Sequence, residues 1–444
     1  MDDTIAAIST PFGEGAIALL RLSGERAIPV ADEVFRGKMR LGDAEPRMQH
    51  LGRIVDEQGA AVDDVLATVF RAPASYTGED MVEISCHGGI LVTRRILQLL
   101  LAHGARSAEP GEFTLRAFLN GRMDLTQAEA VMDLIRAQTD LALRAATEQL
   151  EGRLGAKIRE LREQLLGLLA HVEAYIDFPD EDIDPDTGAA LLAKLESVRE
   201  SIESLLRTAG QGKILREGVR TVIYGAPNVG KSSLLNLLLG YERAIVSETP
   251  GTTRDTIEEV INLRGIPLRL VDTAGVREGG DEVEKQGIER THKQVERAEL
   301  VLRVFDANGV NLNHEATKAQ REIAVLNKCD LGEHPSWKSV EAVRISCKTG
   351  EGMERLADAI FERVMGGGVA TRDASIAINA RHQVCLQKAA QFCNAAKKGI
   401  EDRISAEFIA VELRAALDAV GEVVGKVDSE ELLGEIFSRF CIGK

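Results

Sequence analysis

The sequence lacks an excess of basic residues. It holds 54 lysines and arginines against 70 aspartates and glutamates, which gives a formal net charge of −16. Proteins that bind nucleic acid mainly through its phosphates usually carry a basic surplus. This absence excludes a simple electrostatic nucleic-acid binder. Any contact with RNA is therefore expected to be local, guided by shape, or shared with another subunit.

Paired cysteines and long apolar runs are also missing. The six cysteines include no Cys-x-x-Cys pair, which argues against a structural zinc site or a disulfide framework. No apolar run reaches the roughly 18–20 residues that cross a bilayer. The segment Met1–Thr4 lacks the basic stretch and apolar core of a signal peptide. We therefore expect a cytoplasmic protein with no membrane association.

The chain has 444 residues, 44% of them apolar and 28% charged, and is expected to form two or three domains. Residues 1–120 read as an α/β domain, residues 121–217 and 367–444 carry helical periodicity, and residues 218–366 alternate strands and loops. This order predicts an α/β plus all-α fold class, with an α/β module inserted into a discontinuous helical domain. Extended runs are expected at Thr4–Ser9, Ala16–Leu22, Asp64–Phe70 and Met81–Ser85, and helical segments over Ile90–His103, Leu125–Tyr175, Ala189–Leu215, Leu386–Ala396, Phe408–Val424 and Glu430–Phe440.

A glycine-rich loop between a predicted strand and a predicted helix is the most specific motif. Gly225–Ser232 (GAPNVGKS) matches G-x-x-x-x-G-K-[ST] and follows the apolar strand Arg220–Tyr224. Its glycines let consecutive backbone N–H groups face a phosphate at a helix N-terminus. We expect Lys231 to reach the β and γ phosphates and the Ser232 hydroxyl to bind Mg²⁺.

Two further segments predict a magnesium-dependent switch. The apolar strand Leu268–Val271 leads into Asp272–Gly275 (DTAG). The Asp of such a segment supports the metal through water, and its Gly N–H can sense the γ-phosphate. Upstream, Gly251–Asp255 (GTTRD) offers Thr253 as the second hydroxyl ligand of Mg²⁺.

Another pair of segments predicts recognition of guanine. Asn327–Asp330 (NKCD) follows an apolar strand, and the Asp330 carboxylate can accept hydrogen bonds from both N1–H and the 2-amino group of guanine. Adenine presents no such pair of donors. Ser346–Lys348 follow the strand Val343–Ile345 and can bring a backbone N–H to guanine O6. The four elements in this order predict a Ras-like P-loop GTPase domain.

One position departs from the Ras-like pattern. Val276 stands where those enzymes place a water-orienting glutamine, so catalytic groups must come from elsewhere. The acidic run Asp281, Glu282 and Glu284 is one source. Asn228 is another, because its amide oxygen can bind a monovalent cation beside the phosphates. The same side chains equally suit solvated positions of a switch segment.

With these residues in place, the chain resembles the MnmE (TrmE) family of tRNA modification GTPases, of the TrmE-Era-EngA type, over nearly its full length. The terminal Cys-x-Gly-Lys combined with such a G domain is highly specific to this family. The segments outside the G domain that carry the resemblance are Arg21–Gly24, Tyr76–Asp80, Cys86–Gly89, Pro110–Phe113, Phe118–Asn120, Asp177–Asp180 and Cys441–Lys444.

The resemblance implies a folate-binding and dimerising domain at 1–120, a discontinuous helical domain at 121–217 and 367–444, and a G domain at 218–366. It implies a homodimer that works with an FAD-dependent partner, MnmG (GidA), in a heterotetramer or larger complex. Together they would add an aminomethyl or carboxymethylaminomethyl group to C5 of the wobble uridine of certain tRNAs. The carbon donor would be a tetrahydrofolate in its 5-formyl or methylene form, and FAD would enter only through the partner.

The resemblance also implies roles for individual residues. Dimerisation of G domains around K⁺ would activate hydrolysis, with Glu284 orienting water and Lys231 and Asn228 as further catalytic groups. Some members carry lysine at the position of Arg122, so in this chain the planar guanidinium of arginine replaces a single ammonium group. Folate contacts are expected from Arg21, Glu83, Arg122 and Lys444, and K⁺ contacts from Asn228, Ser247, Thr249 and Thr252. GTP contacts are expected from Asn228, Val229, Gly230, Lys231, Ser232, Ser233, Ser247, Glu248, Thr249, Pro250, Gly251, Thr252, Thr253, Asp272, Thr273, Ala274, Gly275, Asn327, Lys328, Asp330, Ser346, Cys347 and Lys348.

Other reactive residues have less specific contexts. Cys86 and His87 would point to opposite faces of a strand, which disfavours a nucleophile–base pair. The alternating acids from Asp180 to Asp186 lack the Gly and Glu of a calcium loop and suit an exposed linker. Cys441 suits either a buried apolar thiol or a role near the folate. For His171, His292 and His382, surface or packing roles suffice.

The last helix carries a structural prediction. Leu432, Leu433, Ile436, Phe437 and Phe440 recur at helical spacing and give one face to bury. We expect this face to dock so that Cys441–Lys444 reaches the N-terminal domain. Two rival functions remain at this point: a G-protein switch in ribosome assembly or RNA maturation without its own modification role, and a structural dimer with a vestigial nucleotide site.

Overall fold

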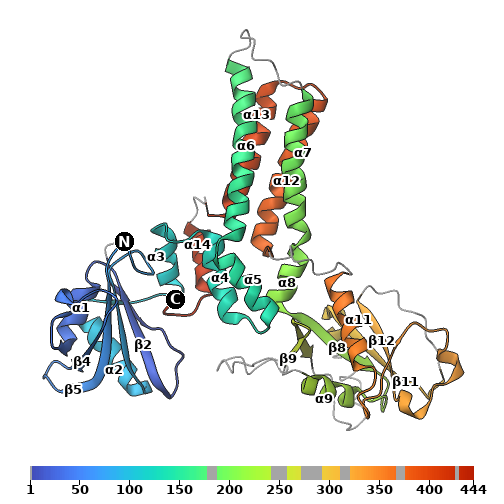
Figure 1. Ribbon diagram of the computed structural model, residues 1–444, viewed down its shortest axis with the longest axis horizontal. Helices are drawn as coiled ribbons and strands as arrows, with labels where there is room; N and C mark the ends of the chain where they lie inside the picture. The colour runs from blue at the N-terminus through green and yellow to red at the C-terminus, as the bar shows by residue number, and fades with distance from the viewer. Residues whose placement is uncertain are drawn as a thin grey trace. The chain divides into compact units, whose positions relative to one another are not determined.

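The computed structural model describes residues 3–177, 188–241, 258–271, 293–310, 321–366, 376–425 and 430–444 (Figure 1). Contacts divide the chain into two compact units. The first comprises Met1–Met132, Gly155–Arg159 and Val420–Lys444, and the second comprises Asp133–Leu154 and Glu160–Ala419. Both ends of the chain therefore belong to the first unit. Among the described residues, no helix is long and apolar enough to cross a membrane.

The first unit is built on a seven-stranded sheet of order β3-β4-β5-β6-β2-β1-β7. Neighbouring strands are antiparallel except β1 and β7, which run parallel. Residues alternate between the faces, so Val65, Ala67 and Val69 of β5 are buried while their neighbours are more exposed. The strands are β1 (Ile5–Ile8), β2 (Gly15–Ser23), β3 (Phe35–Gly37), β4 (Gln49–Val55), β5 (Ala61–Phe70), β6 (Met81–Gly88) and β7 (Arg106–Ser107).

Helices cover this sheet differently on its two faces. Helices α1 (Ala27–Val34) and α2 (Ile90–Ala102) pack on the face that holds the main apolar core. On the other face a smaller cluster gathers Ile5 and Ala7 of β1 with Phe113 of α3 (Glu112–Leu119). Helix α14 (Glu430–Ser438), most of α4 (Leu125–Arg136) and the short helix η1 (Leu41–Asp43) also belong to this unit, as do residues 155–159 and 420–423 of two helices described below.

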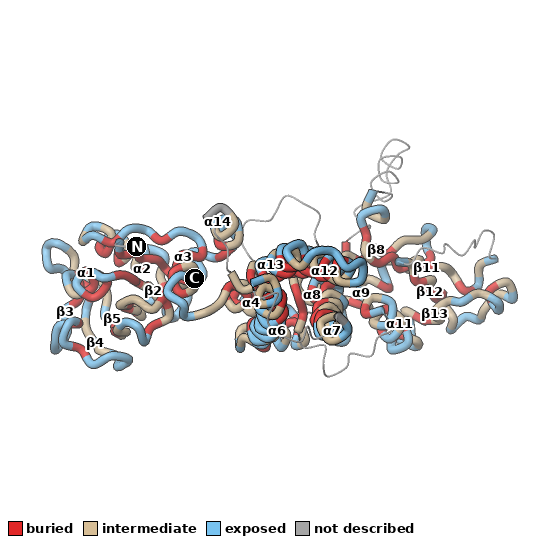
Figure 2. Tube along the Cα trace, turned by 90° about the horizontal axis from the view of Figure 1, so that it is seen from above, coloured by how far each residue is buried: buried red, intermediate tan, exposed pale blue. Residues whose placement is uncertain are grey.

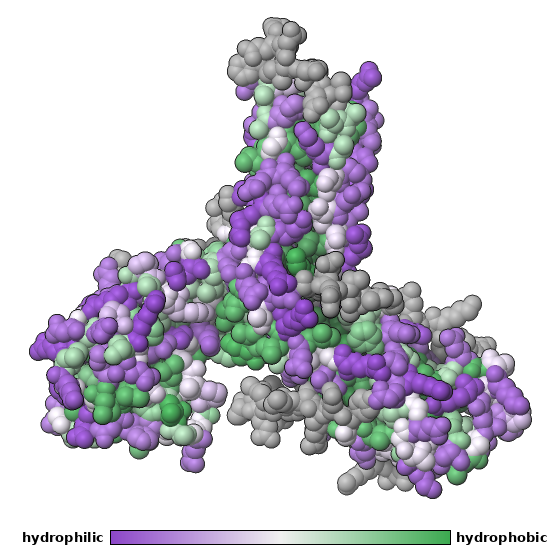
Figure 3. All heavy atoms as spheres, viewed as in Figure 1, coloured by the Kyte–Doolittle hydropathy of each residue, from purple (hydrophilic) through white to green (hydrophobic). Residues whose placement is uncertain are grey.

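Long helices form one part of the second unit. Helices α7 and α12 lie side by side, and Lys397 of α12 donates to Glu196 of α7 at 3.2 Å. Hydrophilic side chains dominate the outward surface of these helices, whereas hydrophobic ones show in the seam between α6 and α7 (Figure 3). The helices are α5 (Asp140–Leu150), α6 (Arg153–Asp177), α7 (Gly188–Arg207), α8 (Ala209–Glu217), α12 (Ala380–Glu401) and α13 (Ala406–Val423).

A six-stranded sheet of order β13-β12-β11-β8-β10-β9 forms the other part. All pairs are parallel except the β9–β10 hairpin. Its central strands are near-continuous apolar runs, and the buried stretches follow β8, β11 and β12 in Figure 2. The elements are β8 (Val219–Gly225), α9 (Lys231–Tyr241), β9 (Glu258–Leu263), β10 (Ile266–Val271), β11 (Leu300–Asp306), β12 (Glu322–Asn327), η2 (Cys329–Leu331), η3 (Pro335–Trp337), β13 (Val343–Arg344) and α11 (Met353–Met365).

The expected fold class, α/β plus all-α with an inserted α/β module, is confirmed. The expected helical stretch over residues 125–175 is divided into α4, α5 and α6, because Thr139 caps a new helix and a turn at Glu151–Gly152 ends it. Strand β4 and helices α1 and α3 were not expected. Strand β4 lacks a clean apolar alternation, and both helices are only eight residues long.

Candidate functional site

The glycine-rich loop joins the end of β8 to the start of α9, as its sequence predicted. A Cβ at Gly225 would lie 2.3 Å from the Val304 carbonyl oxygen of β11, so a side chain would clash with the sheet. Asn228 and Gly230 adopt positive φ angles of 61° and 100°. These left-handed residues turn the backbone back on itself ahead of α9. The loop therefore presents backbone N–H groups at a helix N-terminus, the arrangement that binds phosphate.

Lys231 lies over this loop. Its Nζ donates hydrogen bonds to the carbonyl oxygens of Gly225 at 3.0 Å and Ala226 at 2.8 Å. Burial lowers the pKa of Lys231 below that of an ordinary lysine. Ser232, next along α9, is exposed, so its hydroxyl is open to a metal ion.

Asn327 connects the phosphate loop to the base-reading loop. Its side chain is almost fully buried at the end of β12. Its Nδ2 donates to the Val229 carbonyl at 2.9 Å, and its Oδ1 accepts from the Cys347 backbone N–H at 3.0 Å. Lys328 makes a parallel link, donating to the Asn228 carbonyl at 2.9 Å and to Asp306 Oδ2 at 2.6 Å. The two loops therefore hold each other in place at the carboxyl edge of the sheet.

The Asp330 carboxylate, which is expected to read the base, is itself positioned by a hydrogen bond. The Ser346 hydroxyl is fully buried, donates to Asp330 Oδ1 at 2.6 Å and accepts from the Thr349 N–H at 3.2 Å. Lys348 is exposed beside it. Asp330 lies in η2, after Lys328 in the left-handed conformation. This geometry leaves the second carboxylate oxygen available to a donor on a base.

Several expected site residues lie outside the described part of the chain. They are Ser247, Glu248, Thr249, Pro250, Gly251, Thr252, Thr253, Asp272, Thr273, Ala274, Gly275 and Glu284.

Two of the four expected folate contacts form an ion pair in the first unit. Arg21 of β2 donates to Glu83 Oε1 of β6 through Nε at 3.0 Å and Nη2 at 2.7 Å. The Arg21 guanidinium lies 5.3 Å from the centre of the Tyr76 ring and 5.7 Å from that of Phe113. We call this group, together with Lys444, the Arg21 pocket.

The C-terminus docks beside Arg21, which confirms the prediction for the last helix. Phe437 and Phe440 are buried, and Ile442 forms a β-bridge with Pro110. The Phe113 N–H donates to the Lys444 carbonyl at 3.2 Å. Burial and, to a lesser degree, the positive charge of Arg21 lower the pKa of Lys444, against the opposing effect of Glu83. Lys444 therefore lies within electrostatic reach of both members of the ion pair.

Gly443 explains how the tail fits so closely. Its φ is 91°, and a Cβ there would lie 2.8 Å from Ser9 Cα. The Ser9 hydroxyl also donates to the Gly443 carbonyl at 3.2 Å. The fourth expected folate contact, Arg122, is exposed, and its side-chain carbons lie beside the turn at Gly78.

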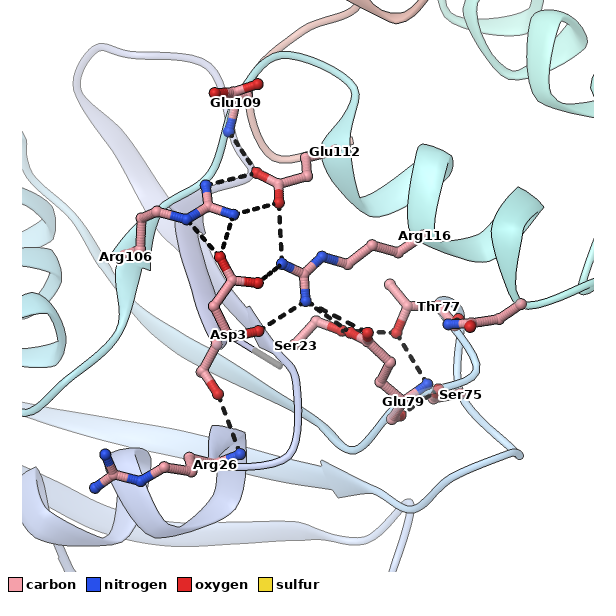
Figure 4. A network of polar contacts seen from close by, with 12 residues as sticks. Asp3, Ser23, Arg26, Ser75, Thr77, Glu79, Arg106, Glu109, Glu112 and Arg116 are labelled. Atoms are coloured by element: carbon pink, nitrogen blue, oxygen red, sulfur yellow. Dashed lines mark hydrogen bonds and ion pairs between the residues drawn. The ribbon is translucent and has the colours of Figure 1, made fainter. Parts of the chain in front are cut away.

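Sequence reasoning missed the buried polar network next to this pocket (Figure 4). Arg116 is 1% exposed and contacts three carboxylates, from Asp3, Glu79 and Glu112. Glu79 and Glu112 belong to the segments Tyr76–Asp80 and Pro110–Phe113 that carried the family resemblance. The available signal was an acidic residue in each of these two segments. Sequence spacing alone could not show that both residues pair with Arg116.

The other reactive residues divide into buried and exposed ones. Cys86 is buried and His87 is exposed, on opposite faces of β6 as expected, and burial raises the pKa of Cys86 to about 11. His87 Nδ1 lies 2.7 Å from Asp63 Oδ1 instead. Cys441 is exposed in the docked tail, so the buried apolar thiol considered for it is wrong. His382 is fully buried in a capping box with Asn379 at the start of α12.

A phosphate loop between β8 and α9, together with base-reading side chains after β12 and β13 of a mostly parallel sheet, defines a P-loop GTP hydrolase. Family models narrow this class. The MnmE helical domain model matches residues 125–441, and the model of the GTP-binding protein TrmE N-terminus matches residues 4–122. The chain belongs to the MnmE family of tRNA modification GTPases.

Curated relatives agree over the whole chain. The tRNA modification GTPase MnmE of Akkermansia muciniphila is 53% identical and covers 99% of each chain. That of Geobacillus kaustophilus is 48% identical over 100% of this chain and 99% of its own. Among solved structures, Aquifex aeolicus Era bound to GDP.AlF4- is 27% identical over 33% of this chain and 56% of its own, with a TM-score of 0.25.

Proposed function

We propose that this GTPase modifies C5 of the wobble uridine in certain tRNAs, together with an FAD-dependent partner of the MnmG (GidA) type. A tetrahydrofolate in its 5-formyl or methylene form would supply the carbon, and the product would carry an aminomethyl or carboxymethylaminomethyl group. The observation that carries this proposal is the docked C-terminus. It brings Lys444 within electrostatic reach of Arg21 and Glu83, which supports a second anion-binding site apart from the nucleotide motifs.

The residues around the phosphate loop suit GTP with Mg²⁺. Lys231 supplies a positive charge above the loop, and the exposed Ser232 hydroxyl begins α9. Thr253 and Asp272 would complete the metal site, directly or through water. When bound, Mg²⁺ neutralises charge on the β and γ phosphates. Asp330, held by Ser346, would select guanine over adenine.

We further propose a K⁺ site that replaces the missing glutamine. Asn228 is exposed at the turn of the phosphate loop, with its φ at 61°, so its amide is free to face a cation beside the nucleotide. Ser247, Thr249 and Thr252 would complete the ligand set, and Glu284 would orient the attacking water. A fixed positive charge of this kind stabilises the negative charge that develops during phosphoryl transfer.

The Arg21 pocket has the chemistry that a reduced folate requires. Arg21 and Lys444 can meet its carboxylates, Glu83 can accept hydrogen bonds from its N–H groups, and Tyr76 and Phe113 offer aromatic surfaces. Arg122 would join from the Gly78 turn. The folate carries the one-carbon unit, and the flavin of the partner supplies the redox chemistry.

The assembly would be a cytoplasmic homodimer bound to its flavin-containing partner. The net charge of −16 supports tRNA binding by this protein and its partner together, because this chain alone has no excess of basic residues to bind the phosphates.

Mass spectrometry of tRNA nucleosides tests the proposal. Cells that lack the gene should lose the wobble-uridine modification, and the wild-type gene should restore it. Lys231→Ala and a deletion of Cys441–Lys444 should each fail to restore it, because they remove different sites. If cells that lack the gene keep the wobble-uridine modification, the proposal is refuted and a switch in ribosome assembly or RNA maturation is favoured. Normal modification in cells that carry only the protein without Cys441–Lys444 would refute the role of the C-terminus.

A further inference from the structure

A buried arginine beside the Arg21 pocket has no role in the sites above. Arg116 of α3 is the largest of the fully buried side chains in the described residues. Its Nη2 donates to Asp3 Oδ1 at 2.7 Å and to Glu112 Oε1 at 3.0 Å. Its Nη1 donates to the Asp3 carbonyl at 2.9 Å and to Glu79 Oε2 at 3.2 Å. Figure 4 shows the guanidinium at the centre of these groups.

The partners of Arg116 come from three segments far apart in sequence. Asp3 precedes β1, Glu79 lies in the turn before β6, and Glu112 opens α3. The separation from Arg116 is 113 residues for Asp3 and 37 for Glu79. One planar side chain therefore joins the N-terminus, a turn and a helix. The same turn and helix are also linked by hydrogen bonds between Tyr76 and Thr114 at 2.9 Å and from Asn120 to the Thr77 carbonyl at 2.8 Å.

Two of the segments that Arg116 joins also build the Arg21 pocket. The turn with Glu79 carries Tyr76, whose ring faces Arg21. Glu112 is followed directly by Phe113, whose ring faces Arg21 and whose N–H holds the Lys444 carbonyl.

The strand that carries Arg21 is linked to the same network. Ser23, two residues from Arg21 on β2, donates to Glu79 Oε2 at 2.7 Å and shares a 2.6 Å hydrogen bond with Thr77. Residues two apart on a strand share a face, so Ser23 and Arg21 point to the same side of the sheet. Ser23 therefore ties the strand that carries Arg21 to Glu79.

The Arg116 network fixes the relative positions of its side chains but adds little net stability to the fold. Buried ion pairs lose hydration and gain little net stability, and Arg116 also buries its Nε without a hydrogen-bond partner. Burial raises the pKa of Glu112, but hydrogen bonds from Arg106, the Glu109 N–H and Arg116 outweigh it, so the net pKa is lowered. The carboxylate therefore stays charged and keeps its bonds at neutral pH.

We propose that Arg116 is a positioning residue for the Arg21 pocket. It holds Tyr76, Phe113 and the Lys444 tail at one fixed spacing around Arg21, without touching the ligand itself. This inference rests on the proposed folate function. A lysine cannot take its place, because one ammonium group cannot reproduce the planar fork that reaches three carboxylates.

The test measures binding of 5-formyltetrahydrofolate to the full chain by calorimetry. Arg116→Lys should weaken binding by about tenfold or more, the equivalent of one lost hydrogen bond. GTP hydrolysis should stay within about twofold, since the nucleotide motifs are complete without Arg116. Arg106→Lys is the matched control: Arg106 pairs with Asp3 and Glu112 but is 44% exposed. Its effect on folate affinity should stay within about threefold, because Arg106 pairs with Asp3 and Glu112 but not with Glu79 in the turn that carries Tyr76.

A double variant separates positioning from mere charge balance. Arg116→Met leaves Glu79 without its buried cation, and adding Glu79→Gln removes that unpaired charge. The thermal midpoint should recover in the double variant while ligand affinity stays low, because the bridge between segments is still missing. Recovery of both would show that Arg116 only balances charge and would overturn the proposal.

A milder change guards against variants that do not fold. Ser23→Ala removes the hydrogen bonds of this hydroxyl to Glu79 and Thr77 and should weaken binding by about two- to fivefold with little change in fold. If wild type binds the folate and Arg21→Ala abolishes binding, unchanged affinity in Ser23→Ala and Arg116→Lys would refute the positioning role alone. If wild type fails to bind the folate, the proposed function fails, and this inference fails with it.

Discussion

The phosphate loop and the Arg21 pocket are both proposed to bind an anion, but they are assembled in opposite ways. The phosphate loop is made of consecutive residues, Gly225–Ser232, between one strand and one helix. The Arg21 pocket joins Arg21 to Glu83, 62 residues away, and closes with a tail whose Gly443 bonds to Ser9 across 434 residues. One site is local in sequence, and the other is made by tertiary packing.

This difference predicts different sensitivities. Backbone N–H groups of the phosphate loop depend on local φ angles, such as those of Asn228 and Gly230. Side chains of the Arg21 pocket depend on how distant segments meet, so a change far from Arg21 can displace it. Damage to the two sites should therefore be separable, and each experiment below probes one side of the comparison.

The largest effect is expected from removing the last four residues, Cys441–Lys444. The deletion takes away a half-buried lysine and the strand-like contact at Pro110. Wobble modification should be abolished, and folate affinity should fall by about a hundredfold, the equivalent of roughly 3 kcal/mol. GTP affinity should be unchanged. Normal modification by the truncated protein would show that the tail is dispensable.

The reciprocal change is Lys231→Ala in the local site. Loss of this cation should lower the rate of GTP hydrolysis by about 10²–10³-fold, the usual effect of removing one group that stabilises developing charge. Folate binding should remain at the wild-type level. Phosphate release measures GTP hydrolysis, and calorimetry measures folate binding. A loss of folate binding in Lys231→Ala would contradict the independence of the two sites.

Base selection gives a smaller effect within the nucleotide module. Asp330→Asn replaces two acceptors by one acceptor and one donor, and it also alters the bond from Ser346. GTP binding should weaken by about 1–3 kcal/mol, with a shift of preference towards xanthosine triphosphate. Competition between the two nucleotides measures the change. Equal affinity of wild type and variant for GTP would remove Asp330 from base reading.

The monovalent cation comes next in size. Turnover should be about tenfold faster in KCl than in NaCl at equal ionic strength. Val276 stands where Ras-like enzymes carry a water-orienting glutamine, and the transition state needs a positive charge. Asn228→Ala should erase the difference. Rates for wild type within twofold of each other in the two salts would rule out the K⁺ site.

The smallest effect concerns pH. Burial, followed by the charge of Arg21, lowers the pKa of Lys444, and a bound anion should raise it again. Binding therefore takes up a proton above the lowered pKa, and folate affinity should fall as pH rises, by at most about tenfold per unit. Lys444→Arg keeps its charge and should flatten this profile. A profile that is already flat in wild type would place Lys444 outside the pocket.

The nucleotide module shows how much local sequence can predict. The strand–loop–helix order around Gly225–Ser232 and the segments after β12 and β13 are placed as the motifs required, because their chemistry depends on neighbouring residues. The burial of Phe437 and Phe440 was also predictable, because a helical period selects its own face.

The sequence by itself determined the class of nucleotide, the phosphate loop, the order of the domains and the apolar face of α14. Only the tertiary structure decided that α3 covers the sheet beside Arg21, that Arg116 collects Asp3, Glu79 and Glu112, and that Arg122 lies at the exposed turn near Gly78. The physical reason is range. Turn conformations and helical periods are set by adjacent residues, whereas a buried charge acquires its partners only when distant segments pack together.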